Sequence, residues 1–141
     1  MAKNFTIEFY GNTTPYVPAT IAAATVIEAG KMVTLDGAWL IVEATAASTA
    51  IAYAPFGSED GQDIILITDH TKAEEFSFVW VPTQALAAID KWVLVDIAIS
   101  WTDQQIDLAN AATGVLKVHP DNRAGAIGST TEVWVTIVKH I

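Results

Sequence analysis

The sequence predicts an all-β or β-dominated fold, a β-sandwich or barrel of short strands with one short helix. Short apolar or alternating runs recur along the chain, and Gly, Pro, Asn and Asp residues interrupt them. Strands do not alternate with long helical segments, which disfavours a parallel α/β fold. A length of 141 residues favours one domain. We expect residues 1–20 to form an N-terminal strand or arm and residues 21–141 to form a single β-rich domain.

The N-terminal segment begins with an alternating pattern that is typical of a half-buried strand. Pro15 and Pro18 then exclude a regular helix and favour an extended connection. Such a segment is either an ordinary first strand and loop or an arm that adds to the sheet of a partner. In the arm interpretation, the contact residues are Phe5, Ile7, Phe9, Tyr10 and Tyr16.

Residues 26–54 are expected to form a small β-unit around Asp36-Gly37. Apolar residues on both sides of this pair fit a two-residue type I′ turn, which requires a positive φ at both positions. We expect strands at residues 32–35, 39–43 and 51–54. The unit contains no His or Cys, and Lys31 is its only basic residue, so it indicates a protein that works through shape and surface.

The rest of the chain is expected to hold the single helix and the remaining strands. A helix over residues 83–91 would be capped by Thr83 and would place Leu86 and Ile89 on one side. The strongest strand pattern covers residues 92–100. Further strands are expected at residues 64–68, 76–81, 115–118 and 133–138.

The charge pattern argues against several classes of partner. The net charge is −9, and the seven basic residues are scattered, whereas nucleic acids and anionic membranes attract clustered basic residues. Charged residues make up only 16% of the chain, and cysteine is absent. We therefore expect no binding to nucleic acid or membrane, no disulfide and no thiol chemistry. Asp96 interrupts an apolar strand and is expected to face solvent or a subunit boundary, because a buried unpaired carboxylate is costly.

Residue patterns for catalysis or metal binding are weak. His70, His119 and His140 are far apart in the sequence and lack the local spacing of metal ligands. Two acidic groups, Glu59-Asp60 with Asp63 and Asp103 with Asp107, are interpreted as solvated loop residues. We therefore expect no catalytic residues, no metal and no cofactor. One alternative is a small enzyme in which the fold brings His119 together with carboxylates.

The five tryptophans are the most prominent candidates for interaction. Trp80, Trp92 and Trp134 lie in or beside strand patterns and are expected in the core. Trp39 and Trp101 flank turns and are candidate exposed interface aromatics, because exposed Trp suits sugar stacking or a protein interface. The alternative for these two residues is also a place in the core.

Three short segments resemble the head decoration, or cement, proteins of tailed bacteriophages. They are residues 28–37 (EAGKMVTLDG), 40–44 (LIVEA) and 51–54 (IAYA). The sequence departs from the family pattern at Lys31, where an acid is usual, and at Ala52, where glycine is common.

The resemblance implies a virion structural protein that binds the outer surface of an icosahedral capsid and stabilises the coat-protein lattice. It further implies the major capsid protein as partner, a homotrimer, and synthesis in the host cytoplasm. Members of this family often contact coat subunits through the N-terminal segment. The alternative is a carbohydrate- or protein-binding β-sandwich module, for example on a phage tail or fibre.

Overall fold

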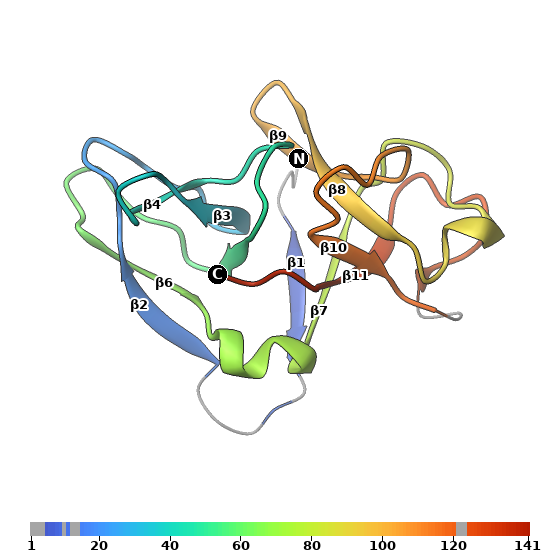
Figure 1. Ribbon diagram of the computed structural model, residues 1–141, viewed down its shortest axis with the longest axis horizontal. Coiled ribbons are helices and arrows are strands. Elements are labelled where there is room, and N and C mark those ends of the chain that lie inside the picture. Colours follow the sequence, from blue (N-terminus) through green and yellow to red (C-terminus); the bar gives the residue numbers. More distant parts are fainter. Residues whose placement is uncertain (1–4, 10, 12–14, 121–123) are drawn as a thin grey trace.

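The computed structural model describes residues 5–9, 11, 15–120 and 124–141 and shows an antiparallel, β-sandwich-like fold (Figure 1). This confirms the β-dominated class. Within the described residues, eleven strands form three sheets. The largest sheet has the order β1 (Thr6–Phe9), β7 (Phe76–Trp80), β11 (Val133–Ile137), β10 (Leu116–Val118), β8 (Leu94–Ser100) and β9 (Asp103–Asp107).

The two smaller sheets come mainly from the first half of the chain. One has the order β4 (Ile41–Glu43), β3 (Lys31–Leu35) and β5 (Ala52–Ala54). The other is a ribbon of β2 (Tyr16–Thr20) and β6 (Ile64–Thr68). Two short 3-10 segments, η1 (His70–Glu75) and η2 (Ala88–Asp90), complete the described elements. No helix in the described ranges is long and apolar enough to cross a bilayer.

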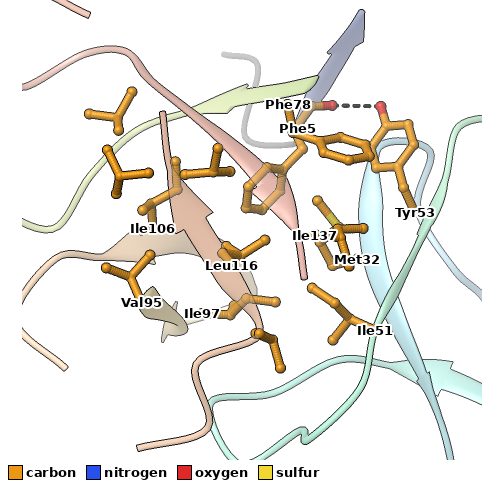
Figure 2. Close-up of a cluster of buried hydrophobic side chains, with 14 of the residues drawn as sticks. Phe5, Met32, Ile51, Tyr53, Phe78, Val95, Ile97, Ile106, Leu116 and Ile137 are labelled. Carbon is orange, nitrogen blue, oxygen red and sulfur yellow. Dashed lines mark hydrogen bonds between the residues drawn. The ribbon is translucent and has the colours of Figure 1, made fainter. Parts of the chain in front are cut away.

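The sheet of β3 and β5 forms a middle layer, because its two faces enter different hydrophobic clusters. Met32 and Tyr53 join the main core with the six-stranded sheet. Val33, Ala52 and Ala54 face the opposite way and pack with the β2–β6 ribbon. The alternation of side chains along a strand thus places one sheet between two apolar surfaces. Figure 2 shows Met32 and Tyr53 among the side chains of the main core.

A buried glutamine ties the middle layer to the six-stranded sheet. Gln104 Oε1 accepts from the Met32 nitrogen (2.7 Å), and Gln104 Nε2 donates to the carbonyls of Met32 (2.9 Å) and Ala44 (3.0 Å). Gln104 is fully buried, so these bonds satisfy polar groups that water does not reach. The side chain therefore fixes how the two sheets pack.

The six-stranded sheet is partly closed on itself. Beyond β7, the Val81 carbonyl accepts from the Ile106 nitrogen (3.0 Å), and the Thr83 nitrogen donates to the Ile106 carbonyl (2.9 Å). These bonds cover part of the outer edge of β9. An exposed strand edge is thereby shortened, which reduces unintended pairing.

The described parts of the N-terminal segment are paired with later strands. β1 runs antiparallel to β7, and β2 runs antiparallel to β6. Phe5 is buried in the main core, and its carbonyl accepts from the Tyr53 hydroxyl (2.7 Å; Figure 2). Burial, together with the nearby Tyr16, raises the pKa of Tyr53 to about 12, so the hydroxyl keeps its proton at neutral pH.

The predicted helix over residues 83–91 is wrong for most of its length. Only η2 is helical in this region, and it is a single 3-10 turn. The Leu86 nitrogen donates to the Ser129 carbonyl (3.0 Å), and the Leu86 carbonyl accepts from the Gly128 nitrogen (2.7 Å). A distant loop therefore takes the backbone bonds that a helix would have formed within itself.

The expected exposure of Asp96 is also wrong. Its buried carboxylate accepts from the backbone nitrogens of Ala112, Thr113 and Gly114 at 2.7–2.9 Å and from the Thr113 hydroxyl. Burial acts to raise the pKa of Asp96, but these hydrogen bonds outweigh burial and lower it. The carboxylate holds the loop before β10 in place.

Candidate interaction surface

Three exposed tryptophans occupy backbone conformations that normally select glycine. Trp39, Trp92 and Trp101 have φ values of 65°, 70° and 60°, and they are 79%, 62% and 96% exposed. Ala24 is the one other non-glycine residue with a positive φ in the described part of the chain. A bulky side chain in this region costs about 1–3 kcal/mol, and such strain clusters at functional sites.

Trp39 lies at the end of the β3–β4 hairpin. The expected two-residue turn at Asp36-Gly37 is wrong, because Asp36 pairs with Leu40 (N–O 2.8 Å) and three residues form the loop. In such loops a type I turn is followed by one residue with positive φ, a position that favours glycine. Gly37 does not take that position; Trp39 does. Asp36 Oδ1 holds the turn by accepting from the nitrogens of Ala38 (2.8 Å) and Leu40 (3.1 Å).

Trp101 occupies the first position of the two-residue turn between β8 and β9. Ser100 pairs with Asp103, and Trp101 is the turn residue with a positive φ. This matches a type II′ turn, in which glycine is preferred at the first central position.

A buried lysine anchors the Trp101 turn to the middle layer. Lys31 Nζ donates to the Thr102 carbonyl and lies 3.4 Å from Glu43 and 3.9 Å from Glu28. The Lys31 side chain is only 2% exposed, so its stem packs inside the fold while its charge is paired. The turn therefore has a fixed position on the molecule.

Trp92 lies in the connection from η2 to β8. Lys91 has φ −66° and ψ 138°, Trp92 has φ 70°, and the Val93 nitrogen donates to the Asp90 carbonyl (3.3 Å). These are the features of a type II turn, in which the third residue is usually glycine. Lys117 Nζ lies 4.4 Å from the centre of the Trp92 ring, so a cation–π contact orients the exposed side chain.

The three turns belong to different parts of the molecule. In Figure 1 the β3–β4 pair lies in the left half, the β8–β9 connection is at the top, and the chain enters β8 from the right. The three turns are therefore separated from one another on the molecule.

Trp39 and Trp101 are exposed, so the alternative that they lie in the core is wrong, while a role in an interface stays a prediction. The expectation that Trp92 lies in the core is wrong, because the chain turns at this residue before β8 begins. Trp80 packs against the main core, and its Nε1 donates to the Gln104 carbonyl. In the sequence, only the polar pair Asp90-Lys91 indicates locally that the chain turns at Trp92.

The candidate contact residues of the arm lie in several environments. Phe5 fills the core of its own chain, and Ile7 packs against the same cluster, so neither side chain is free to fill a pocket on a partner. Phe9 pairs with Phe76 through the β1–β7 register. Tyr10 lies outside the described residues. Tyr16 is half-buried and contacts the Phe56 ring edge-to-face at 5.6 Å, and burial raises its pKa.

The fold brings two of the three histidines together, because the ring centres of His70 and His140 lie 6.5 Å apart. His119 is buried, and no group of three or more His, Asp or Glu side chains in the described residues is placed to hold a metal ion. His70 lines an open hollow with Lys72 and Glu75. His140 Nε2 lies 2.7 Å from the Thr68 hydroxyl, and burial lowers the pKa of His140.

No protein-family model matches the chain, and no curated protein matches it significantly.

Proposed function

We propose that the chain is a non-enzymatic virion structural protein that binds the outer surface of an icosahedral capsid and stabilises the coat-protein lattice. The proposal includes the major capsid protein as partner, a homotrimeric state, synthesis in the host cytoplasm and a final location on the virion. The resemblance of residues 28–37, 40–44 and 51–54 to phage decoration proteins is the reason for proposing a capsid as the binding partner.

The observation that carries the proposal is the set of three exposed tryptophans at glycine-type turn positions. Packing within the chain does not explain them, because their side chains project into solvent and their backbones are strained. Buried aromatic anchors supply much of the energy of protein interfaces. Anchors on separate turns suit a protein that contacts several neighbours at once, as an accessory protein on a lattice does.

A sugar-binding module is the second candidate, favoured by the hollow beside Trp39. Thr34, Asp36, Thr49 and Ile141 also line this hollow, which combines an aromatic ring with polar groups. Two of those polar groups are already engaged. The Thr34 hydroxyl donates to the Ala50 carbonyl (2.7 Å), and Asp36 Oδ1 accepts from the turn backbone. The capsid proposal therefore has the stronger support.

The test is to mix the purified protein with undecorated heads of the virus that encodes it and to image the particles by electron cryo-microscopy. We expect added density at fixed positions of the outer lattice, and heads that withstand heating better than undecorated heads. Absence of added density at saturating protein would reject the proposal. A glycan array on the same preparation tests the second candidate, because specific glycan binding that Trp39→Gly abolishes would favour the sugar-binding module.

A further inference from the structure

The two ends of the long axis of the molecule carry exposed apolar side chains framed by opposite charges. In Figure 1 the β2–β6 ribbon lies at the left end, and the yellow segment that leads into β8 lies at the right end. We define the basic end as the exposed apolar residues of the η2–β8 connection with two lysines: Ile89, Lys91, Trp92, Val93, Leu94 and Lys117. The acidic end comprises Phe56, Glu59, Asp60, Asp63, Ile64 and Leu66.

The basic end is rich in exposed apolar side chains. Four of its apolar residues lie within one six-residue segment and are exposed. Lys117 pairs with Leu94 in the β8–β10 register, and its ammonium group lies over the Trp92 ring. Asp90 and Asp96, the acids of the same segments, are buried and accept backbone hydrogen bonds. The charge of this segment that reaches solvent is therefore positive.

The acidic end combines the outer face of the ribbon with the loop that precedes β6. Ile64 lies opposite Thr20, and Leu66 lies opposite Pro18, and all four residues are exposed. The three carboxylates of residues 59–63 are also exposed. The loop has a fixed shape, because the Gln62 amide donates to the Ile64 carbonyl and the Glu59 nitrogen donates to Gln62 Oε1 (3.1 Å).

We propose that the basic end of one copy docks onto the acidic end of a second copy, head to tail. Trp92, Ile89 and Leu94 would pack on the apolar face of the ribbon, while Lys91 and Lys117 face the carboxylates of the 59–63 loop. Contacts between two basic ends or two acidic ends bring like charges together, so charge selects the unlike pairing. Such a contact is heterologous and closes into a ring or continues as a chain of copies.

This contact is one that the homotrimer of the proposed function could use, but it does not require a capsid. A protein that associates head to tail yet leaves heads undecorated would reject only the proposed function. A monomer that decorates heads would reject only the head-to-tail contact.

Charge reversal with rescue tests the contact by sedimentation velocity at low salt. Wild-type protein is expected to associate with rising concentration, and added salt should weaken the association. Lys91→Glu with Lys117→Glu, and separately Glu59→Lys with Asp60→Lys, should each weaken association at least about tenfold. The protein that carries all four substitutions should recover association, because the charges are again complementary.

Two further variants keep this test decisive. Trp92→Gly removes the central apolar anchor without reversing a charge and should also weaken association. Glu74→Lys with Glu132→Lys changes the net charge by the same amount as the acidic-end pair at two other exposed acids, and it should leave association unchanged. Thermal unfolding followed by circular dichroism verifies that each variant is folded.

Three results would overturn the proposal. The first is a wild-type protein that stays monomeric up to about 100 µM, above the dissociation constants of most specific contacts. The second is association that survives either charge reversal in a folded protein. The third is failure of the folded four-substitution protein to associate, because a head-to-tail contact must be restored when both ends are reversed.

Discussion

The loop at Gly57 and the turn at Trp101 use nearly the same φ angle with opposite kinds of residue. Gly57 has φ 65°, and a Cβ at this position would overlap the Ile27 carbonyl oxygen and the Ala29 nitrogen. Trp101 has φ 60° and projects into solvent. At Gly57 the packing of the fold leaves no room for a side chain. At Trp101 the side chain is 96% exposed, and the proposed function assigns it to a contact outside the chain.

The largest effect on the free energy of unfolding is expected at the buried Gly57. Gly57→Ala should lower the free energy of unfolding by more than about 3 kcal/mol, because backbone overlap adds to the strain of a positive φ. Gly61→Ala is the matched control, since Gly61 has φ 80° and no atom near its missing Cβ. The control should cost about 1 kcal/mol. Urea unfolding of both variants measures the difference, and equal losses would show that packing around Gly57 is not decisive.

Gln104 is a second interior position, and its substitution tests the contribution of a buried polar side chain. Gln104→Ala should lower the free energy of unfolding by about 3 kcal/mol, because it leaves backbone groups of Met32 and Ala44 buried without partners. Gln105→Ala, at the half-buried neighbouring position, should cost less than about 1 kcal/mol. If the two variants have the same urea midpoint, Gln104 does not join the sheets.

The buried Asp96 should make the free energy of unfolding depend on pH. The exposed turns should not have this effect. The pKa of Asp96 is lowered in the fold, so its hydrogen bonds stabilise the protein above the ordinary carboxyl pKa. That stabilisation is lost as the pH falls through the lowered value. Asp96→Asn should cost about 2 kcal/mol at neutral pH. Urea unfolding from pH 7 to pH 2 should show the wild type and variant converging, and a constant difference would contradict this assignment.

The smallest effect is expected at Trp101, and its sign is opposite. Trp101→Gly should raise the free energy of unfolding by about 0.5–1 kcal/mol, because relief of strain exceeds the entropy that glycine adds to the unfolded chain. Trp101→Ala leaves a Cβ at a position with positive φ, which remains unfavourable. This variant should therefore raise the free energy of unfolding only slightly. A loss of stability in Trp101→Gly would mean that the indole supports the fold, which would remove the contrast with Gly57.

The sequence predicted the strand content of this protein better than its turns. Alternation and apolar runs located most strands, since burial on one or both faces determines which residues fit there. Asp36-Gly37 marked a hairpin, but a local pattern does not reveal that Trp39 takes the left-handed position. The same limit hid Trp92, because the strand pattern continues through it. Asp96 and Gln104 bind groups distant in the sequence, and no local signal identifies such partners.

The central claim is that strained, exposed tryptophans are kept in this fold for contact with a lattice. The most direct measurement is equilibrium binding of Trp39→Gly/Trp101→Gly protein and wild-type protein to undecorated heads, by co-sedimentation. Loss of two aromatic anchors should weaken binding by at least about a hundredfold, since each contributes about 2 kcal/mol, while the variant stays folded and at least as stable. Wild-type binding by the folded variant would contradict the claim.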